Sequence, residues 1–545
     1  MKGADAIAEI LKREGTEFLA CYPAQPLIEA CALAGIRPII CRQERVGMAI
    51  ADGFSRINSG KRIGVFAMQQ GPGTENAFPG AAQAFGDNVP ILLLPGGEPT
   101  TRAFIRPGFS AVENYRGVTK WLAQVNHVER IPELMRRAFY HLRTGKGGPV
   151  LLEIPRDVMN GEFTGEIDYA PVEGNSTAPA QREIENVAQV LLGARRLVIH
   201  AGQGVHYAEA WDELKELAEL LQAPVMTTLP GKSAFPENHP LALGASSVST
   251  TKAISHFLQK ADTVFGIGCS FTRTNYGKTI PPGKVMVHAT LDPGDVNKDY
   301  KADYSLIGDA KLTLRALIDE INAQTGGKGK RSNEETVAEV QAVKKEWLDE
   351  WMPQLTSDEV PINPYRIIWD LMHNVDRANT IITHDAGSPR DQLVPFWQTV
   401  APRSYLGWGK STQLGYGLGL IMGAKLAEPD KLCINIMGDA AIGMVGMDLE
   451  TAVRARLGIL TIVFNNGIMA IERRSMVIAH EKYGTLALGG NYRDVSRALG
   501  GWAERVEQPG DFVPTLKRAI EVTKTGQPAM LECMTKEGYD FSRYP

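Results

Sequence analysis

Short apolar runs alternate with helical patterns along nearly the whole 545-residue chain, and this alternation limits the possible folds most strongly. Runs such as residues 63–66, 91–94 and 432–436 have the length and composition of buried strands. Strands that alternate with helices in this way are typical of parallel sheets with helices on their faces. The sequence therefore predicts an α/β protein with doubly wound parallel sheets.

Two stretches interrupt the alternation and divide the chain. Residues 161–179 contain Gly, Asn and Pro with weak periodicity, and residues 324–333 are rich in Gly, Lys and Ser. A chain of 545 residues is also several times the usual domain length. We predict three domains, 1–165, 185–325 and 362–545, of which the first and third are alike in kind.

Charge and composition limit the partners. A net charge of −4 provides no basic face of the kind that nucleic-acid binding needs. No apolar run reaches the roughly 18 residues that span a bilayer. The six cysteines are scattered and lack CxxC spacing, which suits a reducing compartment. We expect a cytoplasmic protein that binds small molecules or protein subunits, with no nucleic-acid or membrane partner.

Polar residues follow two predicted strands of the last domain. One strand ends in Gly438-Asp439 and the next ends in Asn465-Asn466. Ligands bind at the carboxyl ends of strands in an open parallel sheet, and carboxylate and amide oxygens suit a hard cation such as Mg²⁺. Such a cation would hold a diphosphate. On physical grounds alone, a turn at Gly438 and a helix cap at the Asn pair explain the pattern equally well.

The spacing of this segment resembles the signature of thiamine-diphosphate enzymes. Gly438-Asp439-Ala440 is followed by 24 residues and then by Asn465-Asn466. The resemblance implies that Asp439, Asn466 and the backbone carbonyl of Ile468 bind Mg²⁺. Ala440 stands where the family commonly has a third glycine, and this change leaves the ligand positions untouched.

A second match lies some 400 residues upstream. Arg42-Gln43-Glu44, followed by residues 49–56, resembles the cofactor-activating glutamate and its helix in the same family. The resemblance implies that Glu44 hydrogen-bonds the aminopyrimidine ring and favours the imino form, whose nitrogen removes the thiazolium C2 proton. Burial raises the proton affinity of such a carboxylate. Taken alone, Glu44 is simply a solvated charge at a helix start.

Further matches cover the rest of the chain: residues 71–76 resemble the family's GPGxxN loop, residues 147–158 the strand that closes its first domain, and residues 415–419 its glycine-rich helix start. The acetolactate synthases are the most similar subgroup. The resemblance implies a pyrimidine-binding domain, a central Rossmann-like domain and a diphosphate-binding domain. It also implies a homodimer or tetramer in which each cofactor bridges the first domain of one subunit and the third of its neighbour.

The implied cofactor-binding residues are Glu44, Pro72, Asn76, Gly387, Ser388, Thr412, Leu414, Gly438, Asp439, Ala440, Ala441, Asn466, Ile468 and Met469.

Three departures from the acetolactate synthases bear on the ligands. Ser475 replaces the tryptophan that selects the second oxo acid, and Ser270 replaces a central-domain arginine that helps to hold flavin. Ser388-Pro389 replaces a Gln-His pair near the diphosphate. Gly202-Gln203-Gly204 is a weak nucleotide signal, because short GxG turns are common in α/β domains. FAD or ADP in the central domain is left open.

Two more residues are candidates for catalysis beside Glu44. Glu472 falls where simple 2-oxo acid decarboxylases carry a catalytic acid, although a surface ion pair with Arg473 and Arg474 explains it equally well. Gln25 falls where family members place a substrate-facing residue. His384 follows a strand and is a candidate for the diphosphate side, but a core or loop histidine is the simpler interpretation.

The resemblance implies a thiamine-diphosphate-dependent decarboxylating carboligase that acts on 2-oxo acids in the manner of acetolactate synthase. A simple 2-oxo acid decarboxylase and a 2-hydroxyacyl-CoA lyase are the alternatives. A catalytically silent cofactor-binding paralogue and an unrelated nucleotide-binding protein with chance motifs are hypotheses of other classes. The residues above, apart from the substrate contacts, serve all three enzymes equally.

Overall fold

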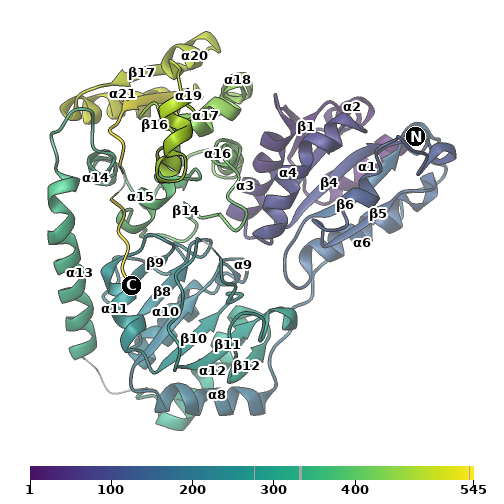
Figure 1. Ribbon diagram of the computed structural model, residues 1–545. Helices are drawn as coiled ribbons and strands as arrows, with labels where there is room; N and C mark the ends of the chain where they lie inside the picture. The colour runs from purple at the N-terminus through teal and green to yellow at the C-terminus, as the bar shows by residue number, and fades with distance from the viewer. Residues whose placement is uncertain (275, 330–333, 539) are drawn as a thin grey trace.

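The protein contains three parallel six-stranded sheets flanked by helices, which confirms the predicted α/β class (Figure 1). The computed structural model describes residues 1–274, 276–329, 334–538 and 540–545, without the side chains of Gln25 and Glu334. Central strands such as β3 (Gly64–Met68) and β16 (Ile459–Asn465) are buried along their whole length. Helices cover both faces of these sheets, which explains why the strands are continuous apolar runs in the sequence.

The first sheet has the strand order β2-β1-β3-β4-β6-β5. Its strands are β1 (Phe18–Tyr22), β2 (Arg37–Ile40), β3, β4 (Ile91–Gly97), β5 (Trp121–Gln124) and β6 (Val150–Pro155). Its helices are α1 (Gly3–Arg13), α2 (Gln25–Leu33), α3 (Glu44–Ile57), α4 (Pro72–Gly86), α5 (Ala111–Asn114), α6 (Ile131–Arg143) and α7 (Arg156–Asn160).

The central sheet has the order β12-β11-β10-β7-β8-β9, which is the strand order of a Rossmann sheet. Its strands are β7 (Leu197–Ala201), β8 (Val225–Thr228), β9 (Ala242–Ser246), β10 (Thr263–Ile267), β11 (Val285–Thr290) and β12 (Tyr304–Ile307). Its helices are α8 (Gln181–Gly193), α9 (Gly204–Tyr207), α10 (Trp211–Leu221), α11 (Lys252–Lys260) and α12 (Ala310–Thr325).

The third sheet, β14-β13-β15-β16-β18-β17, repeats the strand order of the first. Its strands are β13 (Thr380–His384), β14 (Tyr405–Leu406), β15 (Leu432–Gly438), β16, β17 (Trp502–Val506) and β18 (Ala529–Met534). Its helices are α13 (Glu334–Leu355), α14 (Pro364–Asn374), α15 (Ser388–Phe396), α16 (Tyr416–Ala427), α17 (Asp439–Val445), α18 (Leu449–Arg454), α19 (Val477–Tyr483), α20 (Tyr492–Ala498) and α21 (Phe512–Lys524).

Two local predictions need correction. The pattern of residues 444–456 predicts one helix before the strand that ends at Asn465, but α17 ends at Val445 and a 3₁₀ turn, Gly446–Asp448, precedes α18. Glycine, at position 446, is a poor helix former. The predicted linker 324–333 starts too early, since Gln324 and Thr325 continue α12. Its residues 330–333 lie outside the described residues. The predicted domain boundaries stay a prediction.

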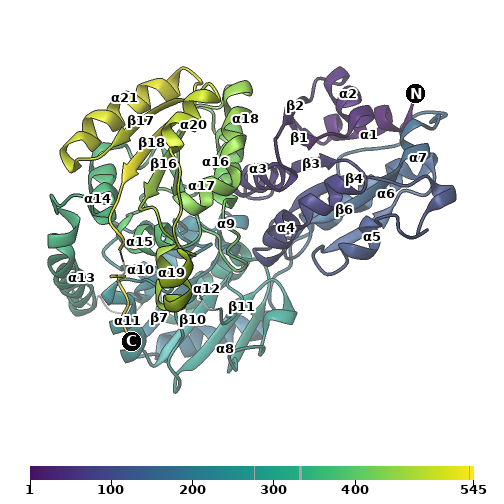
Figure 2. The same ribbon diagram turned by 45° about the horizontal axis from the view of Figure 1, so that its top comes forward.

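Helix α3 of the first domain packs on helix α16 of the third domain within the same chain, as Figures 1 and 2 both show. Glycines allow the two backbones to approach closely. A Cβ atom on Gly53 would lie 2.0 Å from the carbonyl oxygen of Leu420, and one on Gly423 would lie 2.1 Å from that of Ile50. The small residues of this contact therefore fix the position of the first domain on the third.

Gly423→Ala is expected to lower the midpoint of thermal unfolding. The added methyl group overlaps a backbone oxygen that cannot rotate away, and overpacking of this kind costs about 2 kcal/mol. Gly193→Ala, at the end of α8, is the matched control, because a Cβ there has no neighbour within 4 Å. Equal midpoints for the two variants would contradict a tight contact between α3 and α16.

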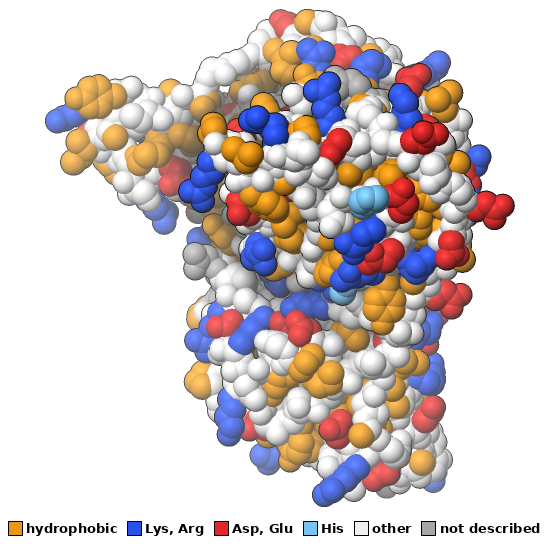
Figure 3. All heavy atoms as spheres, turned by 90° about the vertical axis from the view of Figure 1, so that its right-hand side faces the viewer, with side chains coloured by type: hydrophobic (Ala, Val, Ile, Leu, Met, Phe, Trp, Pro, Cys, Tyr) orange, Lys and Arg blue, Asp and Glu red, His pale blue; other side chains and the backbone are white. Residues whose placement is uncertain are grey.

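On the face drawn in Figure 3, Lys and Arg side chains are interspersed with Asp and Glu. No helix among the described residues is long and apolar enough to cross a membrane. All six cysteines are buried and carry free thiols.

Candidate active site

The ends of β15 and β16 form an anchor around the Asp439 carboxylate. One carboxylate oxygen accepts a hydrogen bond from the Ala440 amide at 2.8 Å. The other accepts from the amides of Asn466 at 3.2 Å and Gly467 at 2.8 Å. The Asn466 side-chain oxygen in turn accepts from the Ile468 amide at 3.1 Å. The structure thus brings together the three residues that the sequence singled out for a metal.

The chemistry of the anchor fits a hard divalent cation. Asp439 is 4% exposed, and burial raises the pKa of its carboxyl while the backbone amides counter that effect. No group of three or more His, Cys, Asp or Glu side chains gathers as a metal site in the described part of the chain. A metal here would therefore combine one carboxylate with amide and carbonyl oxygens, which is a ligand set that Mg²⁺ accepts.

The anchor lies at the topological switch point of the third sheet. Strand β15 is hydrogen-bonded to β13 on one side and to β16 on the other, and the chain order reverses between β13 and β15. Gly387 follows β13 with φ +89° and caps α15. A Cβ on Gly438 would lie 3.7 Å from Pro389, so the two loops touch. Ligands of open α/β sheets bind at such a crevice.

Glu44 begins α3 and is almost enclosed. Its exposed fraction is 5%, and burial raises the pKa of its carboxyl, while hydrogen bonds from its own backbone amide and the Asn76 side chain counter that effect. A Cβ on Gly73 would lie 3.4 Å from a Glu44 carboxylate oxygen. Glycine at position 73 therefore leaves room for the carboxylate beside the 71–76 loop.

Two residues that precede Glu44 contact the segment 444–448, which follows Asp439 in the same chain. The Arg42 amide donates to the Asp448 carboxylate at 2.6 Å, and the Gln43 side chain donates to the Met444 carbonyl at 3.2 Å. The expectation that Glu44 acts in the site of a neighbouring subunit stays a prediction. Within this chain, α3 packs on α16 and brings residues 42 and 43 to the segment that follows Asp439.

Asp385, which follows β13, holds the loop before α16. Its carboxylate accepts from the amides of Gly415 at 2.8 Å and Gly417 at 3.1 Å. His384 beside it is fully buried and stacks on Trp408, with ring centroids 5.1 Å apart. Burial lowers the pKa of His384 to about 3, so the ring is neutral. It is a core histidine, in agreement with the simpler interpretation.

The buried Asp385 makes stability depend on pH. Burial raises its pKa to about 6 from the ordinary 3.8, so the folded protein keeps a proton that the unfolded chain loses. Its contribution to stability is therefore complete below pH 4 and declines by roughly 3 kcal/mol as pH rises to 6. The midpoints of thermal unfolding of the parent and of Asp385→Asn are measured from pH 4 to 7. The midpoint of the parent relative to that of the variant is expected to be highest at pH 4 and to fall as pH rises. Parallel curves would contradict this.

The remaining predicted cofactor residues lie in loops or in the first turns of helices. Thr412 has a left-handed backbone, with φ +55°, and Leu414 is 38% exposed despite its apolar side chain. Pro72 begins α4, and Ser388 begins α15. Ala440 and Ala441 lie in the first turn of α17, and Met469 immediately precedes a 3₁₀ helix, η5 (Ala470–Arg474).

The residues predicted to contact the substrate are more exposed to solvent than the anchor. Glu472 lies exposed in η5, and its neighbour Arg473 pairs with Glu537. Ser475 follows, also exposed. Gln25 begins α2, but its side chain lies outside the described residues.

A cavity of about 920 Å³ lies at the switch point of the central sheet, between β7 and β10. Gly202 and Gly204 allow the two strand ends to approach, since a Cβ on Gly202 would lie 2.3 Å from the Gly268 carbonyl oxygen. Ser270 lines the cavity and accepts a hydrogen bond from Lys410 at 3.4 Å. FAD and ADP, both left open by the sequence, stay its candidate occupants.

Comparison with known proteins identifies the family. Three family models match: the N-terminal TPP binding domain of thiamine pyrophosphate enzymes over residues 1–125, their central domain over 184–317, and their C-terminal TPP binding domain over 385–533. A probable acetolactate synthase large subunit of Methanocaldococcus jannaschii is 31% identical over 95% of this chain and 90% of its own length. The chain belongs to the thiamine pyrophosphate enzyme family.

More distant relatives carry the same description. A probable acetolactate synthase large subunit of Methanococcus aeolicus is 30% identical over 95% of this chain and 90% of its own. The acetolactate synthase isozyme 3 large subunit of Escherichia coli is 25% identical over 97% of this chain and 93% of its own. The resemblance stated from the sequence is therefore confirmed, and the chain is an enzyme that depends on thiamine diphosphate, also called thiamine pyrophosphate.

Several carboxylates of this thiamine-diphosphate enzyme were missed by the sequence analysis. Asp385 fixes the Gly415 loop, and Asp448 fixes the segment before Glu44. Glu532 on β18 accepts from the Asn465 side chain at 2.8 Å and so steadies the end of β16. The position of Asp385 directly after a strand was the available signal in the sequence.

Proposed function

We propose that this enzyme is a decarboxylating carboligase that acts on 2-oxo acids, in the manner of acetolactate synthase. The observation that carries the proposal is that the two residues directly before Glu44 contact Met444 and Asp448, in the segment that follows Asp439, in a chain whose relatives are described as acetolactate synthases. When bound, thiamine diphosphate would supply a nucleophilic carbon and an electron sink for the decarboxylation of a 2-oxo acid.

The residues of the chain have separate roles in this proposal. Asp439, Asn466 and the Ile468 carbonyl would hold Mg²⁺, and the loops at Gly387 and Gly438 would surround the diphosphate. Glu44, enclosed and with a raised pKa, would share a proton with the aminopyrimidine ring. The Thr412 carbonyl would accept from the cofactor's amino group, and Leu414 would hold it bent.

The substrate side rests on Gln25 and Glu472. Gln25 would face the substrate, and Glu472 would deliver a proton to an intermediate in the simple decarboxylase alternative. The relatives' descriptions favour carboligation over simple decarboxylation, over 2-hydroxyacyl-CoA cleavage and over a silent paralogue.

The assembly and compartment are also proposals. We infer a homodimer or tetramer in the cytoplasm, with magnesium as the metal. Exposed apolar side chains near the anchor, Met444, Met447 and Ile471, would be covered by a second subunit. Light scattering of the purified protein at several concentrations measures the assembly.

Product analysis tests the reaction. The enzyme with thiamine diphosphate and Mg²⁺ is incubated with pyruvate, alone and together with a second 2-oxo acid. Release of carbon dioxide is expected, with a 2-hydroxy-2-methyl-3-oxo acid from pyruvate alone and a 2-hydroxy-2-alkyl-3-oxo acid that carries the side chain of the second 2-oxo acid when both are present. Acetaldehyde as the sole product would move the assignment to a simple decarboxylase, and turnover of a 2-hydroxyacyl-CoA alone would move it to a lyase.

A further inference from the structure

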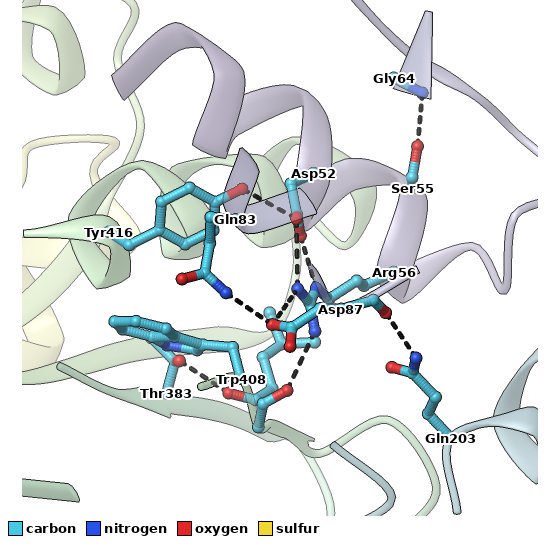
Figure 4. A network of polar contacts seen from close by, with 12 residues as sticks. Asp52, Ser55, Arg56, Gly64, Gln83, Asp87, Gln203, Thr383, Trp408 and Tyr416 are labelled. Carbon is cyan, nitrogen blue, oxygen red and sulfur yellow. Dashed lines mark hydrogen bonds and ion pairs between the residues drawn. The ribbon is translucent and has the colours of Figure 1, made fainter. Parts of the chain in front are cut away.

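A buried polar cluster joins the first domain to the loop that precedes α16 (Figure 4). Asp52 and Arg56 lie on α3, and Gln83 lies on α4. Asp87 follows α4 and pairs with Arg56 at 3.0 Å. Asp52, Gln83 and Asp87 are 0% exposed, and Arg56 is 3% exposed. The cluster lies outside the anchor, and no catalytic role above uses it.

The cluster has more negative than positive charge at its centre. Two carboxylates, Asp52 and Asp87, share the Arg56 guanidinium, which also donates to the Gly407 carbonyl at 3.0 Å. A buried carboxylate that shares its cation needs further donors. Asp87 therefore has to draw hydrogen bonds from groups beyond Arg56.

Those donors are backbone amides of the third domain. Asp87 accepts from the amides of Gly409 at 3.3 Å and Lys410 at 3.2 Å, and from the Gln83 side chain at 2.8 Å. The oxygen of Gln83 accepts from the Gln413 amide at 3.3 Å. One carboxylate and one amide of the first domain thus hold both ends of the segment 409–413.

The held segment is strained and lies next to the proposed cofactor contacts. Thr412 has φ +55°, which is costly for a β-branched residue and persists only where the surroundings impose it. Its carbonyl direction depends on that backbone conformation. Leu414 follows two residues later. The Asp87 and Gln83 hydrogen bonds on the preceding and following amides supply the restraint.

The position of Asp87 is itself fixed from a third direction. Gln203, at the cavity of the central domain, donates to the Asp87 carbonyl. All three domains therefore meet at this residue. A carboxylate with so little freedom is suited to orient another segment.

We propose that Asp87 and Gln83 are positioning residues, which set segment 409–413 so that Thr412 and Leu414 meet the pyrimidine side of the cofactor. This inference rests on the proposed roles of Thr412 and Leu414. The first domain would then contribute to the site twice, through Glu44 and through the Asp87 and Gln83 pair. The anchor around Asp439 does not depend on Asp87 or Gln83.

Calorimetry of Asp87→Asn with two probes tests the inference. The first probe is thiamine diphosphate with Mg²⁺, which needs both segment 409–413 and the anchor. The second is inorganic diphosphate with Mg²⁺, which needs the anchor alone. We expect affinity for the first probe to fall about tenfold or more, because Asn cannot accept from every donor that faces Asp87. Affinity for the second is expected to stay within about twofold.

The matched control is Glu237→Gln. Glu237 is also a buried carboxylate in an ion pair, with Lys232, and accepts from the third-domain amide of Thr399 at 2.8 Å, but it does not contact segment 409–413. It is expected to bind both probes as the parent does. If Asp87→Asn fails to fold, Gln83→Met carries the test, since it removes the acceptor for Gln413 and keeps the Asp87–Arg56 pair.

Two results would overturn the inference. Parental affinity for thiamine diphosphate in both variants would show that the cluster does not position the segment. Equal losses for both probes, with a lowered unfolding midpoint, would show a purely structural role. A parent protein that binds no thiamine diphosphate in the presence of Mg²⁺ would instead refute the proposed function, and this outcome is distinct from the other two.

Discussion

Glu44→Gln is expected to lower turnover by about 10²- to 10⁴-fold, the usual contribution of a positioned acid or base. Glutamine has nearly the same shape but cannot share a proton with the aminopyrimidine ring. Because Glu44 is 5% exposed and its pKa is raised by burial, a neutral side chain is tolerated at this position. The variant should therefore fold and bind thiamine diphosphate, and the defect should appear in the chemical step.

The decisive measurement is hydrogen–deuterium exchange at the C2 carbon of the bound cofactor. Exchange needs no substrate, so it isolates proton removal from every later event. Glu75→Gln is the control, since Glu75 lies exposed on α4 beside Asn76 and should leave exchange unchanged. If Glu44→Gln exchanged at the parental rate with cofactor bound, the activating role of Glu44 would be wrong.

The fold could be predicted from the sequence because its physical cause is local. Strands buried on both faces must be apolar along their length, so runs such as 432–436 and 460–464 are evident in the sequence. The carboxyl ends of these two strands lie at the same edge of the sheet, so Asp439 and Asn466 could be predicted to lie close together. Glu44 could not be found in this way, since a carboxylate at a helix start has no distinctive pattern, and the family resemblance was needed.

The carboxylates that support the site could not be predicted from the sequence, for a different reason. Asp385, Asp87 and Asp448 act on backbone amides of distant segments, such as Gly415, Gly409 and Arg42. Every residue except proline has such an amide, so the acceptor has no partner that the sequence can reveal. Their roles depend on how domains dock, and the docking depends on glycines whose purpose appears only when α3 and α16 are in contact.

Asp439→Asn is expected to weaken Mg²⁺-dependent binding of thiamine diphosphate by about 100-fold or more, which corresponds to about 3 kcal/mol lost from an ion pair. Asparagine keeps an oxygen for the amides of Asn466 and Gly467 but has no charge for the cation. Its other group is an amide donor that faces the Ala440 amide. The apoprotein should lose about 1–3 kcal/mol of stability, because the new amide donor and the Ala440 amide both lack an acceptor there.

Mn²⁺ in place of Mg²⁺ allows the bound metal to be measured directly by electron paramagnetic resonance, without any turnover. The parent should bind Mn²⁺ tightly only when thiamine diphosphate is present, because the diphosphate supplies the remaining ligands. Glu153→Gln is the control: Glu153 is likewise a buried carboxylate that accepts from a backbone amide, that of Val112, but it lies in the first sheet. An Asp439→Asn protein that retained the parental Mn²⁺ signal would remove Asp439 from the metal site, and the anchor would then have to bind diphosphate through backbone amides alone.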